Sequence, residues 1–435
     1  MWRVNAEERL STLREVELAG NCSHPIRLSG EMVNFSTGEI TRSSLRISCK
    51  DRRQVVCPSC SYLYRTDAWI LVSTGLVGGK GTPEEVSSHP RLFITVTAPS
   101  FGPVHTIKNR GECVGHSRTT RSISGELCAH GRPRICGVRH EETSSELGRP
   151  LCSECFDYEG AILWNAHSSK LWNNTIQAIR RSLAEAGGLG QRNLKSAAQV
   201  HYLKVAELQR RGLVHFHVVL RADGPDDVGE PVPTWLSIEL LSRVVRQSIR
   251  RASVVQPNRA DYRWGQLLDV QELRSDSNDT GAVASYLAKY VTKTTDGSTE
   301  LARRFASRRQ IENLVDDPHA RRLAVTSWNL ASRLELEPFR LRDHAHTFGF
   351  TGLPITKSRN YSTTFAALRA HRATFMAVRN ESDPIEGSFH YEGRGYDNPR
   401  SVELAEVFFS MRRELRQESA QARRTQERDT RGGSL

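Results

Sequence analysis

The sequence QVHYLKVAELQRRGLVHFHVVL, residues 199–220, contains two apolar runs on either side of the polar link QRRG. Two such runs joined by a short link that contains glycine are typical of a β-hairpin. His215 and His217 stand two positions apart in the second run, and side chains two apart on a strand lie on one face. Both imidazoles can therefore bind one cation. The alternative is a half-buried strand that exposes two histidines and binds no metal.

The register of this hairpin decides whether a carboxylate joins the two histidines. If Gln209 pairs with Leu213, Glu207 lies opposite His215, with the two Cβ atoms about 4.5–5.5 Å apart. Two imidazoles and one carboxylate that converge in this way suit a divalent cation with open coordination positions. A register slip of one residue would turn Glu207 to the other face and leave it as a solvated carboxylate.

A third candidate element is the segment Gly281–Lys293, GAVASYLAKYVTK, which predicts a helix. Tyr286 and Tyr290 lie one turn apart in it and form a stripe beside the apolar residues. The plainer interpretation is that both tyrosines are edge residues of an amphipathic helix. Chemically, a tyrosine can also act as a covalent nucleophile, and two adjacent ones can perform two successive transfers. A metal ion would polarise the phosphate, and a nearby lysine would stabilise negative charge.

The remaining patterns define the fold class. Arg91–Thr97, RLFITVT, is β-branched and aromatic as in a strand, and residues 266–272, QLLDVQE, are a second candidate strand. Helices are expected at 161–186 and 235–252. We therefore expect an α/β (α+β) protein in which helices flank a central antiparallel sheet. The histidine pair lies on a central strand of that sheet, and the tyrosine helix packs alongside.

The composition favours an intracellular protein that binds a polyanion. The 435 residues carry 61 Lys and Arg against 49 Asp and Glu, a net charge of +12, and the pI is about 9.5. This charge points to nucleic acid first and to a membrane surface second. The run Trp69–Gly79 is far shorter than the roughly 20 apolar residues that span a bilayer. Because residues 1–20 contain no apolar signal-peptide region, we expect a cytoplasmic protein without membrane contact.

Eight of the nine cysteines fall into two sets of four, each with one Cys-x-x-Cys pair, and Cys113 is left over. Four thiolates can form a tetrahedral structural zinc site, which would supply folding free energy to segments without long apolar runs. The expected sites are Cys22, Cys49, Cys57 and Cys60, and Cys128, Cys136, Cys152 and Cys155. His130 or His140 could replace one ligand of the second set. The alternative to zinc is scattered buried cysteines with a redox pair.

Basic side chains near these elements are candidates for DNA contacts. Arg210 and Arg211 occupy the predicted hairpin tip, beside the expected metal site. The segment TKSRNY contains Lys357 and Arg359, which can bind phosphates, and Tyr361, which can stack on a base. A solvated loop is an equally good interpretation of that segment.

Three motifs, in order, resemble those of the HUH endonuclease superfamily. They are Phe93–Ser100 (FITVTAPS), a strand ending in Thr-x-Thr; Glu207–His217 (ELQRRGLVHFH), with a carboxylate eight positions before the first histidine; and Ser285–Lys293 (SYLAKYVTK), with the paired tyrosines. Within that superfamily the chain resembles the rolling-circle replication initiators of actinobacterial plasmids and integrative elements. The resemblance extends over roughly residues 20–370 and includes both cysteine sets.

The resemblance implies a metal-dependent nuclease that nicks one strand at a plasmid double-strand origin. A tyrosine would join the 5′ phosphate, a free 3′ hydroxyl would remain for a polymerase, and the same site would later rejoin the displaced strand. The expected partners are origin DNA, single-stranded at the nick, and a host helicase and polymerase. By the family pattern, Glu207, His215 and His217 bind Mg²⁺ or Mn²⁺, Tyr290 and Tyr286 are nucleophiles, and Lys289 and Lys293 assist at the phosphate or metal.

The resemblance also suggests a domain order. The expected parts are an N-terminal zinc-binding module and helix (1–88), an HUH endonuclease domain (89–300) with an inserted zinc module at about 108–160, a helical, basic DNA-binding region (301–410), and a charged tail (411–435) that is a frayed helix or disordered. Two other functions remain open. One is an HUH transposase with the same chemistry, and the other is a non-catalytic, zinc-dependent DNA-binding regulator whose histidine strand is structural.

Overall fold

The computed structural model describes residues 6–34, 37–108, 112–113, 127–136, 138–225, 228–256, 261–273, 277–292, 300–380 and 385–432. The chain divides into two compact units. The larger unit spans residues 68–365, and the smaller unit joins 1–67 to 366–435. The division falls within helix α2 (Pro58–Val77). No helix in the described ranges is long and apolar enough to cross a membrane.

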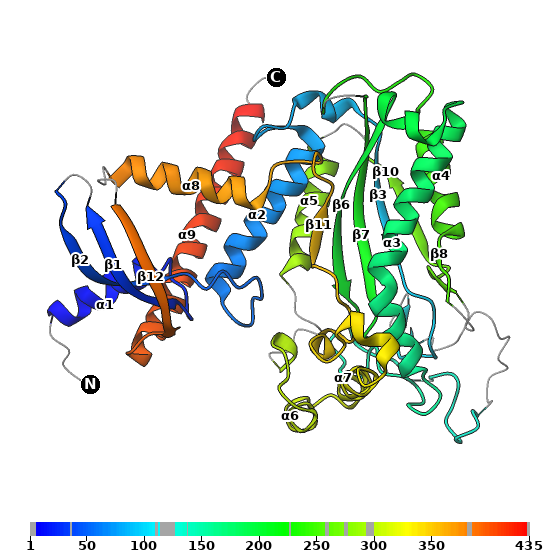
Figure 1. The fold of residues 1–435 in the computed structure, drawn as a ribbon, viewed down its shortest axis with the longest axis horizontal. Helices are drawn as coiled ribbons and strands as arrows, with labels where there is room; N and C mark the ends of the chain where they lie inside the picture. Colours follow the sequence, from blue (N-terminus) through cyan, green and yellow to red (C-terminus); the bar gives the residue numbers. More distant parts are fainter. Residues whose placement is uncertain are drawn as a thin grey trace. The chain divides into compact units, whose positions relative to one another are not determined.

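The larger unit is built on a five-stranded sheet with the order β10-β3-β7-β6-β11 (Figure 1). Its strands are β3 (Arg91–Val96), β6 (Gln199–Leu208), β7 (Val214–Asp223), β10 (Leu268–Glu272) and β11 (Ile355–Lys357). Every pairing is antiparallel. The expected central position of the histidine strand is confirmed, because β7 has two strands on either side. All of its residues except His215 are buried.

The β6–β7 hairpin has the register that the sequence predicts. The backbone amide of Gln209 donates to the carbonyl of Leu213 at 2.9 Å, and Glu207 lies opposite His215. Gly212 closes the turn with a φ of +78°, a left-handed conformation that favours glycine. A Cβ at this position would also lie 2.1 Å from the side chain of Leu323, so a larger residue would disturb both backbone and packing.

One face of the sheet carries the main hydrophobic core. Helices α3 (Tyr158–Ala186) and α4 (Ile238–Arg251) contribute buried apolar side chains to it. Trp172 of α3 meets Phe216 of β7 at a steep angle, with ring centroids 6.4 Å apart. The apolar face of α3 therefore packs against the apolar face of β7 on this side of the sheet.

Helix α5 (Ser277–Val291) lies over the opposite face (Figure 1). Because side chains alternate along β7, Phe216 points to α3, whereas His215 and His217 point to α5. A single strand thus supports the core with one set of residues and presents the histidine pair with the other.

Shorter elements complete the larger unit. They are the 3₁₀ turns η1 (Glu84–Ser88), η2 (Gln191–Ser196), η4 (Glu300–Ala302), η5 (Leu334–Phe339) and η6 (Ala345–Thr347), the helices α6 (Arg308–Leu314) and α7 (Pro318–Leu330), and two strand pairs, β4 (Ile107–Lys108) with β5 (Glu112–Cys113) and β8 (Ser253–Val254) with β9 (Tyr262–Arg263).

The smaller unit contains a second antiparallel sheet, which the sequence did not lead us to expect. Its order is β12-β1-β2, with β12 (Ile385–Arg394), β1 (Ile26–Asn34) and β2 (Ile40–Ile47). The central strand β1 pairs with its sequence neighbour β2 on one side and with β12, from the other end of the chain, on the other. No local pattern indicates a pairing between such distant segments. The expected domain boundaries, which followed chain order, stay a prediction.

Three helices belong wholly or largely to the smaller unit. They are α1 (Ala6–Leu18), α8 (Phe365–Asn380) and α9 (Pro399–Gly432). Helix α9 continues to Gly432, so the segment 411–435, for which we expected a frayed helix or a disordered tail, is helical over its described part. The reason is composition, since Arg, Glu, Gln and Ala are strong helix formers even where no apolar face exists.

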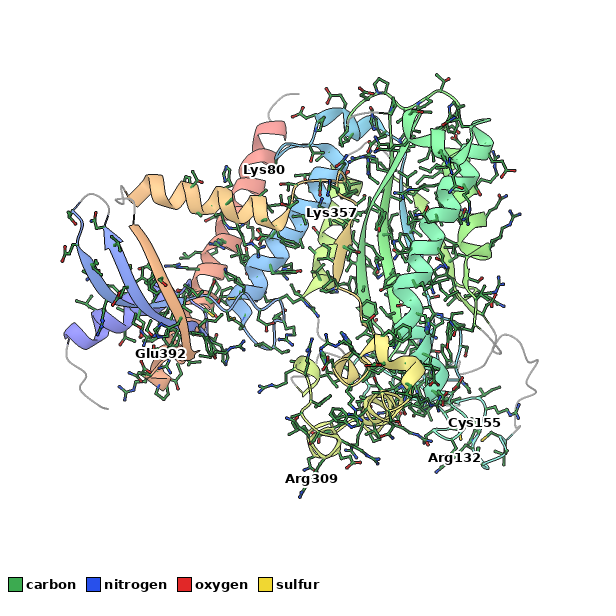
Figure 2. All side chains as sticks on the ribbon, viewed as in Figure 1. Lys80, Arg132, Cys155, Arg309, Lys357 and Glu392 are labelled. Carbon is green, nitrogen blue, oxygen red and sulfur yellow. The ribbon has the colours of Figure 1, made fainter. Side chains whose placement is uncertain are left out.

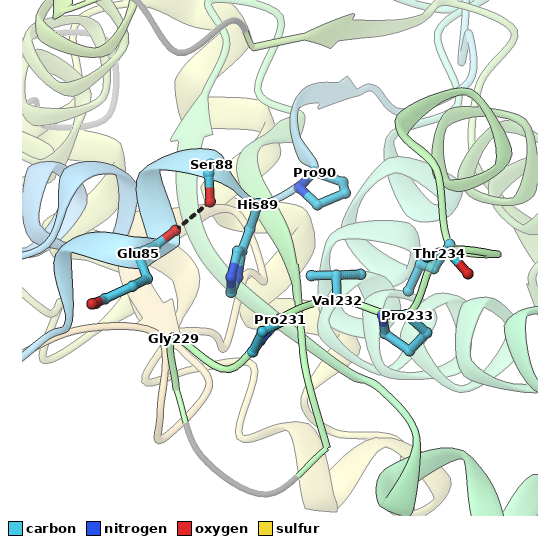
Figure 3. Close-up of a pocket in the computed structure, with 10 residues that line it drawn as sticks. Glu85, Ser88, His89, Pro90, Gly229, Pro231, Val232, Pro233 and Thr234 are labelled. Carbon is cyan, nitrogen blue, oxygen red and sulfur yellow. Dashed lines mark hydrogen bonds between the residues drawn. The ribbon is translucent and has the colours of Figure 1, made fainter.

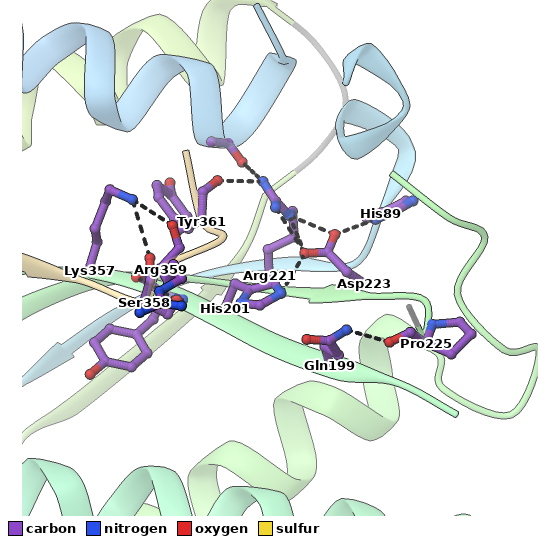
Figure 4. A network of polar contacts seen from close by, with 12 residues as sticks. His89, Gln199, His201, Arg221, Asp223, Pro225, Lys357, Ser358, Arg359 and Tyr361 are labelled. Carbon is purple, nitrogen blue, oxygen red and sulfur yellow. Dashed lines mark hydrogen bonds and ion pairs between the residues drawn. The ribbon is translucent and has the colours of Figure 1, made fainter. Parts of the chain in front are cut away.

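A buried ionic network ties the far end of β7 to the rest of the larger unit (Figure 4). Arg221 and Asp223 are both buried, and the guanidinium Nε donates to the carboxylate at 2.8 Å. Arg221 also donates to the carbonyls of Gly75 and Tyr361, and Asp223 lies 2.7 Å from Nδ1 of His89. Burial works to raise the pKa of Asp223, but the hydrogen bonds from His89 and Arg221 outweigh it and lower that pKa.

A cavity of about 440 Å³ opens beside His89 (Figure 3). In the η1 turn that lines it, the hydroxyl of Ser88 donates to the backbone carbonyl of Glu85 at 2.8 Å. The cavity lies where β7 ends, away from the histidines at the start of that strand, and holds none of the predicted site residues. Its lining is Glu85, Ser88, His89, Pro90, Gly229, Pro231, Val232, Pro233, Thr234 and Leu236.

The first prediction concerns the Arg221–Asp223 pair. Replacing Arg221 with alanine leaves a buried carboxylate without its main partner, so we expect the free energy of unfolding to fall by about 3–5 kcal/mol. Urea unfolding followed by tryptophan fluorescence measures the change. The matched control is Arg250→Ala, on the exposed side of α4, which should change stability by no more than about 0.5 kcal/mol. Equal stability of the two variants would contradict a stabilising network.

Candidate active site

Three ligand groups converge on the α5 face of the hairpin. Nε2 of His215 lies 2.8 Å, and Nε2 of His217 3.4 Å, from the same oxygen, Oε2 of Glu207. The side chain of His217 is only 2% exposed and that of Glu207 16%. Two imidazole nitrogens and a carboxylate oxygen, all within 4.8 Å of one another, could hold one divalent cation. The expected convergence of these three side chains is confirmed, and the bound metal stays a prediction.

The second nitrogen of each imidazole has a partner of its own. Oγ1 of Thr95 lies 3.1 Å from Nδ1 of His217, and the side-chain amide nitrogen of Gln209 lies 3.2 Å from Nδ1 of His215. The carbonyl oxygen of Gln209 accepts a hydrogen bond from Arg211 at 2.9 Å. Partners of this kind orient the rings of histidine ligands. They leave the two Nε2 atoms turned towards Glu207.

Both tyrosines of α5 lie against the ring of His217. The ring centroid of Tyr286 is 5.0 Å and that of Tyr290 5.2 Å from the imidazole, and the two phenol rings are 4.8 Å apart. Phe93 of β3 completes the cluster, parallel to His217 at 6.0 Å and edge-on to Tyr286 at 5.8 Å. The two residues predicted as nucleophiles therefore stand together beside the three ligand groups.

Helix α5 is held in place by its apolar stripe. Ala284, Leu287 and Val291 are completely buried, and Nε1 of Trp69 donates to Oγ of Ser285 at 3.3 Å. Tyr286 lies on the flank of this stripe and is 40% exposed. The tyrosines thus lie at the edge of an amphipathic helix and also next to the histidines, because this edge of α5 faces the sheet at the ligand groups.

The surroundings of the two phenols combine partial burial with one nearby lysine. Burial, and after it the hydroxyl of Tyr290, raise the pKa of Tyr286. Nζ of Lys289 lies 5.9 Å from the ring centroid of Tyr290, near enough to stabilise negative charge that forms there. Lys293, the second predicted lysine, lies outside the described residues.

The first cysteine set lies in the smaller unit and forms a core of its own. Sγ of Cys49 is 3.6 Å from that of Cys60, and Sγ of Cys57 is 3.7 Å from that of Cys22. Thiolates around a tetrahedral zinc, with Zn–S of about 2.3 Å, are roughly 3.8 Å apart, whereas a disulfide measures about 2.05 Å. The spacing fits zinc, and the hydroxyl of Tyr396 closes the cluster by donating to the carbonyl of Cys22 at 2.9 Å.

The second set differs from the expected one in a single ligand. It consists of Cys128, His130, Cys152 and Cys155. Nδ1 of His130 lies 3.3 Å from Sγ of Cys155 and 3.8 Å from Sγ of Cys152. His130, the alternative ligand, takes the place of Cys136 in this group, because the chain reverses between Cys128 and Arg132 and returns His130 to the cysteines. Cys136 lies apart from the group, and the residues that bind zinc stay a prediction. Figure 2 shows Arg132 and Cys155 at the same end of the larger unit.

Similarity to known proteins extends over nearly the whole chain. The family described as "Replication initiator protein, pSAM2" matches residues 10–409. The chain belongs to this family of replication initiators. A replication initiator protein from Streptomyces ambofaciens is 34% identical over 417 residues, which cover 90% of this chain and 86% of the relative. No solved structure matches the chain.

The initiator exposes only some of the residues predicted to contact DNA. Arg210, at the hairpin tip, and Arg359 are exposed. Nη1 of Arg210 donates to the backbone carbonyl of Ser144 at 3.1 Å. Lys357 is half-buried, and its ammonium donates to the carbonyls of Ser358, Arg359 and Ser362, so it holds its own loop together.

Two other predicted DNA contacts are structural in the initiator. Tyr361 is fully buried, and a Cβ at Gly75 would touch its ring at 2.2 Å. The expectation that Tyr361 stacks on a base was wrong, because the loop after β11 turns this ring into the interior. Arg211 donates to the carbonyls of Ala98 and Pro99, and burial lowers its pKa to about 10. Its contacts fix the turn beside the ligand groups.

Sequence reasoning missed two residues that shape the site of the initiator. Thr95 and Phe93, both within the quoted strand motif, contact His217 from β3. Their spacing of two puts them on one face of that strand, which is a usable signal. What the sequence did not show is that β3 pairs with β7 so that Thr95 lies opposite His217.

The second prediction tests the role of the Thr95 hydroxyl. In Thr95→Val the imidazole of His217 loses its orienting partner, so we expect Mn²⁺ to bind about 10–100-fold more weakly. Electron paramagnetic resonance of free Mn²⁺ in a titration of the zinc-loaded initiator measures the affinity. The control is Thr97→Val, which removes a hydroxyl bonded to the carbonyl of Leu267 and touches neither histidine. Equal Mn²⁺ affinity in both variants would refute the assignment.

Proposed function

We propose that this initiator is an HUH-type endonuclease that nicks one strand of a plasmid double-strand origin and becomes joined to the 5′ phosphate through a tyrosine. The observation that carries the proposal is the meeting of Glu207, His215 and His217 with the rings of Tyr286 and Tyr290 on one face of the sheet. Membership of the replication initiator family supports origin DNA as the substrate.

The proposed step exchanges one phosphate ester for another. The phenol oxygen of a tyrosine forms a bond to phosphorus while the bond from phosphorus to the 3′ oxygen breaks. The phenol loses its proton to solvent, and the departing 3′ oxygen takes one up and becomes a free hydroxyl. Mg²⁺ or Mn²⁺ held by Glu207, His215 and His217 would polarise the scissile phosphate. Lys289, beside Tyr290, stabilises negative charge on the phenolate or phosphate.

A pair of tyrosines fits the two transfers that rolling-circle replication requires. The first attack starts replication and leaves a 3′ hydroxyl that a host polymerase extends, while a host helicase separates the strands. The second attack cuts the displaced strand, and the released 3′ hydroxyl then rejoins the first end. Since the two rings are 4.8 Å apart, the second phenol lies close to the first throughout.

Contacts to the DNA strand would come from the exposed arginines. Arg210 extends from the hairpin tip, a few residues from Glu207 and His215, and Arg359 follows β11 at the other side of β6. Both can bind backbone phosphates without reading sequence. As the resemblance to HUH endonucleases implies, the substrate would be single-stranded at the nick.

The third prediction assigns the nucleophiles. With an origin oligonucleotide and Mn²⁺, Tyr290→Phe should lose initial cleavage and the covalent adduct, because the substitution removes the hydroxyl that would attack phosphorus and keeps the ring that packs in the site. Tyr286→Phe should retain part of the cleavage but fail in strand rejoining, and the double variant should form no adduct. Tyr391→Phe, an exposed tyrosine of β12, is the control and should behave as wild type.

Mass spectrometry of the DNA-linked peptide decides between outcomes. An adduct on Tyr290 or Tyr286 supports the proposal. A wild-type adduct yield in the double variant means that the nucleophile lies elsewhere, and the absence of any adduct in the wild type would favour a non-catalytic DNA-binding initiator.

The fourth prediction concerns the metal. His217→Ala removes one of three ligands and should abolish nicking while leaving affinity for the origin oligonucleotide within about twofold, because the arginine–phosphate contacts that dominate affinity stay in place. Nicking of supercoiled plasmid and fluorescence anisotropy measure the two effects. His371→Ala, on the exposed side of α8, serves as control. Undiminished nicking by His217→Ala in buffer treated with chelator would exclude a metal at this site.

A further inference from the structure

A third group of metal-type ligands lies in the connection between β3 and α3, apart from both cysteine sets. Nδ1 of His105 is 3.1 Å from Nε2 of His140, and Sγ of Cys136 is 3.4 Å from the same Nε2. The three ligand atoms lie within 4.8 Å of one another. The two imidazole planes are nearly perpendicular, at 89°, with ring centroids 4.9 Å apart.

Hydrogen bonding alone does not account for this arrangement. Nδ1 of His140 lies 3.2 Å from the carboxylate of Glu146, which can only accept, so Nδ1 donates to it and Nε2 is the nitrogen that faces the other two groups. His105 and Cys136 both approach Nε2, and an imidazole nitrogen has only one direction for a hydrogen bond, whether it donates or accepts. A cation between the three atoms accounts for all of these contacts, with Glu146 as the partner that orients His140.

The distances fit zinc. Around a tetrahedral ion with Zn–N near 2.0 Å and Zn–S near 2.3 Å, ligand atoms are roughly 3.3–3.7 Å apart. The observed separations of 3.1 and 3.4 Å lie within a few tenths of an ångström of these values. Thiolate together with imidazole is the ligand set that zinc prefers over magnesium or calcium.

The surrounding segment needs such a centre. Among the described residues between Ala98 and Cys152, no hydrophobic side chain is buried, yet His140 is only 6% exposed. A buried imidazole in a segment without an apolar core points to a metal as the source of folding free energy. The backbone closes around the group, since the amide of His105 donates to the carbonyl of Arg149 and its carbonyl accepts from Gly148, both at 2.9 Å.

We propose that His105, Cys136 and His140 bind a zinc ion of their own, a third structural site that the cysteine pattern does not reveal. The site would hold residues 144–148 against the tip of the β6–β7 hairpin. Arg210 donates to the carbonyl of Ser144 there, and Gly148 packs so closely that a Cβ would lie 2.5 Å from the backbone of Arg210. The ion thus supports the turn that positions Glu207 and His215, whatever reaction the initiator performs.

The fifth prediction is a zinc count on the full-length protein, by elemental analysis and native mass spectrometry. Cys136→Ser and His140→Ala should each contain one zinc per chain less than wild type, and together they should still lose only one. Cys152→Ser removes a ligand of the separate second set, so Cys136→Ser combined with Cys152→Ser should lose two. His140→Cys, which keeps a ligand, should restore the wild-type count, and His371→Ala should leave it unchanged.

A wild-type zinc count in Cys136→Ser would overturn the proposal. So would a loss of only one zinc in the Cys136→Ser and Cys152→Ser combination, since the two cysteines would then share an ion. Labelling of the unmodified protein with N-ethylmaleimide gives an answer even if a variant fails to fold. Cys136, which is only partly buried, should react slowly when the protein is zinc-loaded and rapidly after chelation. Rapid labelling in the zinc-loaded protein contradicts a zinc–thiolate bond.

Discussion

The pairing of Glu207 with His215 across the β6–β7 hairpin is the constraint on which the candidate site depends. Because strand side chains alternate, this one register puts the carboxylate and both histidines on the α5 face, and a shift by one residue would send them into the core. The turn that sets the register is specified by Gly212 and by the contacts of Arg211 with the β3–α3 connection. The geometry of the turn therefore determines the geometry of the site.

The central position of β7 in the sheet gives it two tasks. Alternate residues fill the hydrophobic core beneath α3, while the others, apart from Val219, carry polar groups that a core strand would normally exclude. At one end these are the histidines, and at the other they are Arg221 and Asp223, which are stabilised only because each meets charged or hydrogen-bonding partners. These contacts fix the side chains at both ends of the strand, and the proposed cleavage, in which a phosphate would lie between a metal and a phenol, depends on such fixed positions.

Clusters of cysteine and histidine take over where apolar residues are scarce. In the smaller unit the buried cluster consists of Ala19 and three cysteines, with Cys49 and Tyr396 packed against it. That cluster lies where the two chain ends meet, at the sheet formed by β1, β2 and β12. The β3–α3 connection likewise contains two groups of cysteine and histidine side chains in place of a hydrophobic core: Cys128 with His130, Cys152 and Cys155, and Cys136 with His105 and His140. A polar, basic surface suited to DNA is compatible with such small cores, because metal–ligand bonds need little buried area.

The local sequence was sufficient for the elements whose periodicity is strong: the hairpin and its register, the strand at 91–96, the long helices α3 and α4, and the tyrosine helix. From these followed the antiparallel sheet and the meeting of Glu207 with His215 and His217. Tertiary structure alone decided which distant segments pair, because hydrogen bonding between strands carries no signature in either strand separately. It joined β12 to β1, set Thr95 opposite His217, exchanged Cys136 for His130, and buried Tyr361 against Gly75. Each outcome depends on contacts between residues far apart in the chain, and these form only when the whole core is packed.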